Sequence, residues 1–214
     1  MGCSWVVNMD LRLFSDRTMC VVGPSHSGKT SFVLKLLDKH HEMFRTPAQR
    51  IVWCYGHYQH KMHQELEEKG YVLHRGIIPS EEVQPHDVVV LDDLLHESKT
   101  SGDMTSMFTQ AAHHKPCFVI FITQNLYPPG REARTRSLNT HYYVIMKNPR
   151  DKAQIRVLAQ QMVPGQTQAF IEMFAKVTQE PHSYLFIDLT QECPESLRFR
   201  SHLFDFPMYS YKLN

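Results

Sequence analysis

Apolar residues in this chain fall into short continuous runs that alternate with segments of helical spacing. The runs predict strands at residues 18–23, 51–55, 71–73, 87–92, 117–123, 141–146 and 183–188. The predicted helices lie between them, at residues 29–39, 58–69, 103–114, 151–162 and 167–177. Runs with almost no polar alternation are typical of strands that are covered on both faces of a parallel sheet. The pattern therefore predicts an α/β fold with a mainly parallel central sheet flanked by helices.

No repeat, low-complexity block or linker interrupts this pattern, so we predict a single domain over residues 1–214. We expect its core at about residues 15–190 and a C-terminal tail at about 191–214, which the pattern assigns to no element. A chain of 214 residues suits one well-buried domain. The net charge is only +1, so a surface that binds nucleic acid would have to be local.

Cysteine usage indicates a reducing compartment. Cys20, Cys54 and Cys117 lie inside apolar runs, and no pair has the spacing of a metal or redox motif. No apolar run approaches the roughly 20 residues that a transmembrane helix needs, and no signal peptide is evident. We therefore expect a protein of the nucleus or cytoplasm that is neither secreted nor membrane-bound.

The segment from Gly23 to Thr30 matches the phosphate-binding pattern GxxxxGK[ST] at every fixed position. It follows a buried strand and opens an amphipathic helix, and this context is the one in which such a loop binds phosphate. Lys29 would reach the β- and γ-phosphates, and the Thr30 hydroxyl would bind Mg²⁺. The residues that we expect to contact the nucleotide are Gly23, Pro24, Ser25, His26, Ser27, Gly28, Lys29, Thr30 and Ser31.

Two acidic residues end the apolar run at 88–91. Asp92 lies at the carboxyl end of this strand, the edge at which open α/β sheets bind ligands, and we expect it to hold Mg²⁺ beside Thr30. Asp93 is then placed to orient or deprotonate an attacking water. Glu97 is the alternative for that role.

The apolar run at 117–123 ends in Gln124 and Asn125. An amide at this edge can hydrogen-bond the attacking water or the γ-phosphate, so we expect Gln124 to act as a sensor of hydrolysis. Motor ATPases of the additional-strand (ASCE) type insert one strand between the P-loop strand and the acidic strand. Either residues 51–55 or the strand before Gln124 could fill that place.

The segment between positions 131 and 156 contains seven basic residues and only two acidic residues. Such a region is a solvated face, a contact for a DNA backbone, or the source of an arginine finger that reaches a neighbouring subunit. The basic residues are Arg131, Arg134, Arg136, Lys147, Arg150, Lys152 and Arg156.

Histidines recur at a spacing of three at His57, His60 and His63. A metal site is conceivable, but no cysteine or acid stands at ligand spacing, so we interpret them as exposed or capping residues. The chain also lacks the NKxD motif of guanine-specific GTPases.

The order of these motifs resembles the FtsK/HerA superfamily of DNA-pumping ATPases, in particular its viral genome-packaging branch. That branch occurs in Polinton/Maverick elements, adintoviruses, poxviruses and other large DNA viruses, and the chain most resembles the Polinton and adintovirus type. The segments that carry the resemblance are GPSHSGKTSFVLKLL (23–37), VVVLDDLLHE (88–97), ITQN (122–125), RTRSLNTHYYVIMKNPRDKAQIRVLAQQM (134–162) and YLFIDLTQECPESLRFRSHLF (184–204).

The resemblance implies a ring-shaped motor that uses ATP and Mg²⁺ to move double-stranded DNA, with a capsid or portal-like protein as a further partner. It also implies a location in the nucleus or cytoplasm of a host cell, with association with the virion as an alternative. It implies that a subunit-bridging arginine completes the site, and we expect Arg134 or Arg150 in that role. Cellular members carry Asp-Glu where this chain has Asp92 and Asp93, so the shorter base implies a repositioned water.

Other functions remain open at this point. A helicase or another DNA translocase would carry the same motifs, and a small-molecule kinase would share the phosphate loop but need an acceptor pocket. A scaffold that binds ATP without hydrolysing it would differ by its lack of turnover.

Overall fold

Six parallel strands form the centre of the sheet, and four antiparallel strands extend it on one side. A computed structural model describes residues 3–5, 10–94, 115–127, 137–205 and 207–213 of the chain. In this part of the chain the strand order is β1-β10-β9-β8-β7-β2-β6-β5-β3-β4. Neighbours from β7 to β4 are parallel, whereas β8, β9, β10 and β1 each pair antiparallel. The predicted α/β class with a mainly parallel sheet is confirmed.

The central strands are the apolar runs of the sequence. In chain order the described strands are β1 (Cys3–Trp5), β2 (Thr18–Val22), β3 (Arg50–Tyr55), β4 (Val72–Arg75), β5 (Asp87–Asp92), β6 (Phe118–Thr123), β7 (Tyr142–Met146), β8 (Tyr184–Asp188), β9 (Phe199–Ser201) and β10 (Tyr209–Tyr211). Every residue of β2, β6 and β7 is buried, because helices cover both faces of the sheet there.

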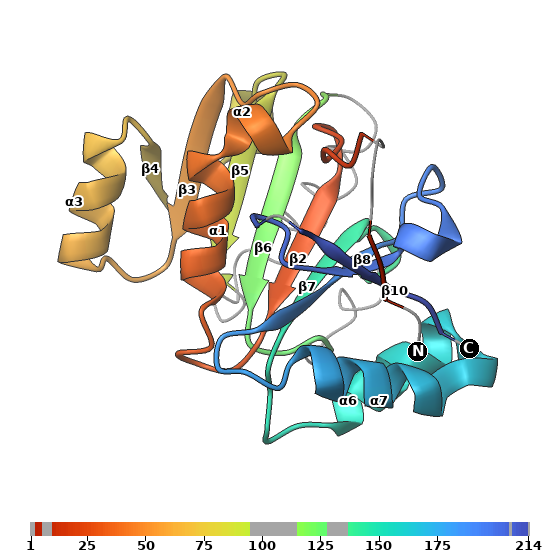
Figure 1. Ribbon diagram of the computed structural model, residues 1–214. Helices are drawn as coiled ribbons and strands as arrows, with labels where there is room; N and C mark the ends of the chain where they lie inside the picture. Colours follow the sequence, from red (N-terminus) through yellow and green to blue (C-terminus); the bar gives the residue numbers. More distant parts are fainter. Residues whose placement is uncertain (1–2, 6–9, 95–114, 128–136, 206, 214) are drawn as a thin grey trace.

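Helices pack on both faces of the sheet (Figure 1). The described α-helices are α1 (Lys29–Asp38), α2 (His40–Met43), α3 (His60–Glu68), α6 (Ala153–Met162) and α7 (Thr167–Val177). The apolar residues of α1 pack with Met19 and Val21 of β2, whereas those of α6 and α7 pack with Cys20 and Val22. Alternate β2 residues point to opposite faces, so one strand contributes to both cores.

Short 3₁₀ turns connect some of these elements, at Ser80–Glu82, Pro164–Gln166 and Glu195–Leu197. The predicted helix at 103–114 lies outside the described residues. Cys20, Cys54 and Cys117 are buried, as the sequence predicts.

The strand before Gln124 is the inserted strand. β6 lies between β2 and β5, and β3, which contains residues 51–55, lies on the far side of β5. This is the ASCE order, and it decides between the two alternatives that the sequence left open.

The segment after residue 190 is part of the sheet. β9 pairs with β8 and β10 pairs with β9, so the tail continues the sheet instead of following it. The pairing places Arg200 in the interior, where its guanidinium donates a 2.5 Å hydrogen bond to Asp188 and lies 4.7 Å from the Phe186 ring centroid. β9 therefore carries a buried charged residue at a position where an apolar side chain would have identified the strand from the sequence.

Candidate functional site

The carboxyl ends of β2, β5 and β6 meet at one edge of the sheet because the three strands are parallel. A cleft of about 950 Å³ opens there. Most of the predicted site residues line it, namely Ser25, His26, Ser27, Gly28, Lys29, Thr30, Ser31, Asp92, Asp93 and Gln124. The structure therefore brings together three motifs that are up to about a hundred positions apart in the sequence.

The loop between β2 and α1 has the tight backbone that a phosphate nest needs. Gly28 adopts a left-handed conformation with φ of 98°, and His26 has φ of 61°. A Cβ atom on Gly23 would lie 2.6 Å from both Met146 Cβ and Ser27 Oγ, so only glycine fits there. Gly23 is the first residue of the loop, and its N–H donates to the Thr123 carbonyl at 3.2 Å. The sequence pattern and the geometry agree at each of these positions.

Lys29 is half-buried at the start of α1. Its Nζ donates to the carbonyl oxygens of Gly23 at 2.7 Å and Pro24 at 2.9 Å. Burial lowers the pKa of Lys29, an effect that the Asp93 and Asp92 carboxylates oppose. The Oγ of Ser27 is buried with no partner in the described structure. An ammonium held only by carbonyls and an orphaned hydroxyl are groups that the oxygens of a phosphate can satisfy.

Asp92 ends β5 and faces the same cleft. Burial, and then the charge of Asp93, raise the pKa of Asp92 to about 6, against a smaller opposing effect of Trp53, His63 and Lys29. The indole Nε1 of Trp53 has no hydrogen-bond partner in the described structure, so Trp53 acts on Asp92 through a longer polar contact. Two neighbouring carboxylates in a partly buried cleft favour a bound cation, which would stabilise the charged form of Asp92.

Asp93 and Gln124 form a pair at the rim of the cleft. Asp93 is exposed and has a left-handed backbone with φ of 49°, and its N–H donates to the Ile122 carbonyl at 3.3 Å. The amide Nε2 of Gln124 donates to Asp93 Oδ2 at 3.2 Å. The strained turn thus directs the Asp93 side chain toward β6, where Gln124 orients it.

A solved structure from an archaeal virus has the same architecture. It is the genome packaging NTPase B204 from Sulfolobus turreted icosahedral virus 2, solved in complex with sulfate. The match has a TM-score of 0.51 and 12% sequence identity, and it covers 91% of this chain and 97% of B204. The chain has the P-loop NTPase fold.

A KaiC-like protein, PH0186 from Pyrococcus horikoshii OT3, matches with a TM-score of 0.46 and 10% identity over 92% of this chain and 90% of that protein. No protein-family model matches the sequence, and no curated protein matches it.

Within this P-loop NTPase fold, Thr30 and Asp92 are the residues that would hold Mg²⁺. Both line the cleft, and both offer the oxygen ligands that this cation prefers. The raised pKa of Asp92 indicates an uncompensated carboxylate at this point. The described residues therefore fit the cation, and its role would be to offset charge on the phosphates.

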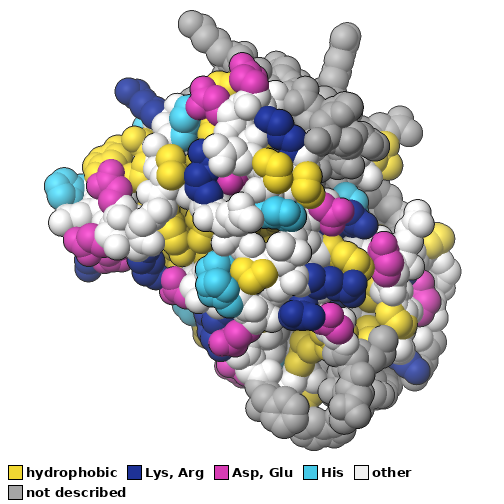
Figure 2. Space-filling view, turned by 90° about the horizontal axis from the view of Figure 1, so that it is seen from above, with side chains coloured by type: hydrophobic (Ala, Val, Ile, Leu, Met, Phe, Trp, Pro, Cys, Tyr) yellow, Lys and Arg dark blue, Asp and Glu magenta, His cyan; other side chains and the backbone are white. Residues whose placement is uncertain are grey.

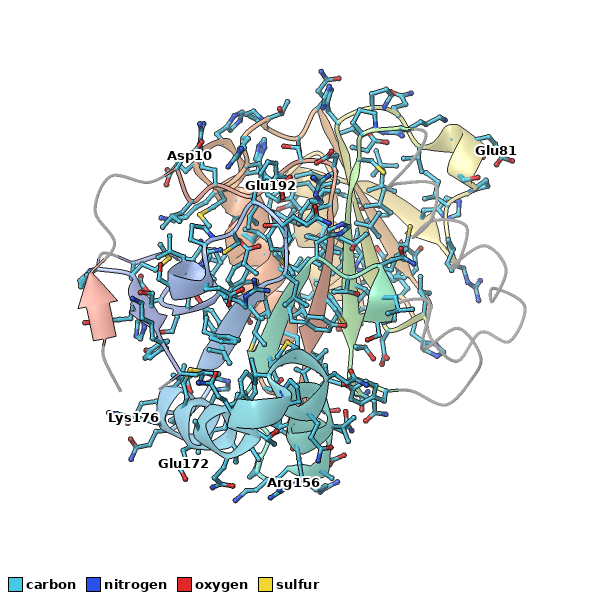
Figure 3. The ribbon with its side chains drawn as sticks, turned by 90° about the vertical axis from the view of Figure 1, so that its right-hand side faces the viewer. Asp10, Glu81, Arg156, Glu172, Lys176 and Glu192 are labelled. Carbon is cyan, nitrogen blue, oxygen red and sulfur yellow. The ribbon has the colours of Figure 1, made fainter. Side chains whose placement is uncertain are left out.

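The described basic residues of the run between 131 and 156 do not line the cleft at the P-loop. Arg131, Arg134 and Arg136 lie outside the described residues. Arg150 is exposed at the carboxyl edge and does not line the cleft. The ammonium of Lys147 donates to the Gln179 carbonyl. Arg156 is exposed and points outward from α6 (Figure 3). Within one subunit, no described arginine of this run completes the site.

Charges of both signs are also interspersed on the opposite side of the molecule, which Figure 2 views from the amino-terminal ends of the parallel strands. The described part of that face carries no large field of one sign.

The histidine triplet does not form a metal site. Among the described residues, no group of three or more His, Cys, Asp or Glu side chains is arranged to hold a metal ion. His57 and His60 are exposed, as predicted. His63 is instead fully buried, and its Nδ1 accepts the Gln59 N–H at 2.8 Å. It therefore caps the start of α3 from the interior, behind Asp92.

Sequence reasoning missed one side of the cleft. The lining residues on this side that it did not single out include His182, Tyr184, His202 and Phe204. No local pattern marks them, because the antiparallel strands β8 and β9 bring them to the loop. In the part of the chain that the structure describes, no helix is both long and apolar enough to cross a membrane.

Proposed function

We propose that this chain is an ATP-hydrolysing motor that moves viral double-stranded DNA into a capsid. The proposal of ATP hydrolysis rests on one observation. Lys29, Asp92, Asp93 and Gln124 all line the same cleft. A fold that only bound ATP as an assembly signal would need the lysine and the loop but not a paired acid and amide.

The chemistry is an in-line displacement. A water oxygen attacks the γ-phosphorus while the bond from this phosphorus to the β–γ bridging oxygen breaks and leaves its electrons on ADP. Asp93 accepts the proton of the water, and Gln124 holds the Asp93 carboxylate and orients the water. Lys29 and the loop N–H groups offset the charge that develops on the phosphate oxygens. Bound Mg²⁺ would add to this charge compensation.

Two observations support DNA packaging as the purpose of this hydrolysis. Resemblance to viral packaging ATPases extends over most of the chain, including the segments at 134–162 and 184–204. B204, which shares the fold over 97% of its length, is a genome packaging NTPase. An arginine such as Arg150 or Arg134, supplied by a neighbouring subunit of a ring, would complete the site.

The test is the rate of ATP hydrolysis with and without blunt duplex DNA. We expect duplex DNA to raise the rate, and we expect Lys29→Ala to lower it about a hundredfold or more while the fold is kept. Lys39→Ala, at the other end of the same helix, is the matched control and should hydrolyse ATP normally. Normal turnover by Lys29→Ala would contradict the assignment of the site.

Two further measurements test the motor itself. Mass measurement with a non-hydrolysable ATP analogue should find a ring of subunits, and a persistent monomer would contradict a shared site. Translocation along blunt duplex without strand separation supports packaging. Unwinding of a forked substrate would instead identify a helicase, and phosphoryl transfer to a small acceptor would identify a kinase.

A further inference from the structure

The cleft extends to both sides of the P-loop strand. β6 and β5 lie on one side of β2 and contribute Gln124, Asp93 and Asp92. β7, β8 and β9 lie on the other side, and this half contains none of the hydrolytic residues described above. The residues that line it include Met146, His182, Tyr184, Ser201, His202, Phe204 and Asp205.

The position of the hydrolytic residues sets the direction of a bound nucleotide. The γ-phosphate has to lie near Asp93 and Gln124, since these are the groups that act on it. The rest of the triphosphate follows the loop around the start of α1, which begins at Lys29. The sugar and base then extend toward the half of the cleft that β8 and β9 line.

That half has an aromatic wall. The ring of Phe32 lies 4.8 Å from the Tyr184 ring in an edge-on contact and 5.0 Å from the Phe204 ring. The ammonium of Lys35 lies 4.9 Å from the centroid of Phe204 and 3.6 Å from the Asp205 carboxylate. The Tyr184 hydroxyl accepts the Leu203 N–H at 3.0 Å, which ties this segment to β8. Contacts within the chain thus hold the three rings of the wall together.

Backbone strain gathers around the same cleft. Among the described residues other than glycine, those with positive φ are His26, His86, Asp93, His182 and His202. All but His86 line the cleft. His182 has φ of 60°, and a Cβ atom on Gly28 would lie 3.5 Å from its Nδ1, so the imidazole packs against the phosphate loop. Strained backbone of this kind is typical of ligand-binding sites.

We propose that the half of the cleft formed by Tyr184, Phe204 and the two strained histidines binds the purine base of the nucleotide. This inference rests on the proposed function, because it assumes that the P-loop binds a nucleoside triphosphate. The flat faces of Phe204 and Tyr184 offer stacking surface, and His182 and His202 border the base from the α7–β8 loop and from the segment after β9. The tail that extends the sheet is thereby part of the nucleotide site.

The experiment compares the binding of MgATP and of magnesium tripolyphosphate, which lacks sugar and base, by titration calorimetry. The wild-type chain should bind ATP more tightly than tripolyphosphate. Phe204→Ala should weaken ATP binding about tenfold, from the usual worth of base–aromatic stacking, and leave tripolyphosphate binding within about twofold. CTP and UTP should bind less tightly than ATP and GTP, because their rings stack over a smaller area.

Phe14→Ala is the matched control. Phe14 is also a partly buried ring with a cation over it, here Arg45 at 3.7 Å, but it does not line the cleft. It should change neither affinity. Phe204→Leu keeps the apolar volume without the aromatic face and serves if the alanine variant does not fold. It should weaken ATP binding while leaving tripolyphosphate binding intact.

The outcomes separate the two proposals. Failure of the wild-type chain to bind either ligand would overturn the nucleotide site as a whole. Equal affinity for ATP and tripolyphosphate would overturn only the base-binding half. An equal loss of both ligands in Phe204→Ala and Phe204→Leu would show that Phe204 acts through the fold, and this also overturns the inference.

Discussion

Asp92→Asn tests the electrostatics of the cleft, because it removes a charge and keeps the shape of the side chain. Burial, followed by the charge of Asp93, raises the pKa of Asp92 from 3.8 to about 6. Between these two pH values the folded protein holds a proton that the unfolded chain has released. The free energy of unfolding of the wild-type chain therefore falls as the pH rises through this window.

The size of the effect follows from the pKa difference. Each unit is worth 1.36 kcal/mol, so a difference of about two units corresponds to about 3 kcal/mol. Asp92→Asn has no proton to lose at this position. Its free energy of unfolding, relative to the wild-type value, should thus rise by about 2.4 kcal/mol between pH 4 and pH 7.5, because part of the change already lies below pH 4.

Urea denaturation in metal-free buffer with EDTA measures this difference across the pH range. Glu172→Gln, on the outward face of α7 (Figure 3), provides the control for loss of an exposed carboxylate. Its difference from wild type should stay within about 0.5 kcal/mol at each pH. A difference for Asp92→Asn that does not change with pH would refute the reasoning, since Asp92 would then not be a desolvated acid beside Asp93.

The same variant tests the role of Asp92 toward Mg²⁺. Wild-type protein with MgATP at a hundred times its dissociation constant should gain about 2.7 kcal/mol of stability. Part of this stabilisation depends on Mg²⁺, and Asp92→Asn should lose most of that Mg²⁺-dependent part. An unchanged response to Mg²⁺ would contradict the assignment of Asp92 as a ligand.

Three other predictions follow from the geometry. Gly23→Ala places a methyl group 2.6 Å from its neighbours, so it should destabilise the chain by about 1–3 kcal/mol in urea denaturation and weaken ATP binding. Gly165→Ala has open space around the new methyl group and should have little effect in the same two assays. Asp188→Ala leaves the buried guanidinium of β9 without a counter-charge and should cost about 3–5 kcal/mol in urea denaturation, against less than about 1 kcal/mol for Glu195→Ala in an exposed pair. Arg150→Ala subunits should hydrolyse ATP poorly alone and regain activity when mixed with subunits whose P-loop lysine is replaced, and no recovery on mixing would exclude this arginine as a residue that acts in trans.

Much of the core was predictable from short stretches of sequence. α7 begins and ends at the predicted residues, Thr167 and Val177, because Phe170, Met173 and Phe174 recur at helical spacing. β5 ends at Asp92, as its apolar run predicts. These elements depend on local periodicity, which each segment carries by itself.

The tail shows where local patterns fail. β9 and β10 have three residues each, and β9 carries the buried Arg200. A strand this short has little periodicity, and a buried arginine suggests an exposed position until its partner Asp188 is known. Only pairing with a strand already in the sheet identifies it. The same applies to His182 and His202, whose positive φ angles no sequence pattern marks.

The sequence by itself determined the phosphate loop and the strand-end positions of Asp92, Asp93 and Gln124, because a loop motif and an apolar run are each local. The tertiary structure decided that β6 lies beside β2, that the last strands run antiparallel, and that the tail reaches the cleft. These features depend on contacts between segments far apart in the chain. Backbone pairing and burial select them only when the whole sheet is assembled.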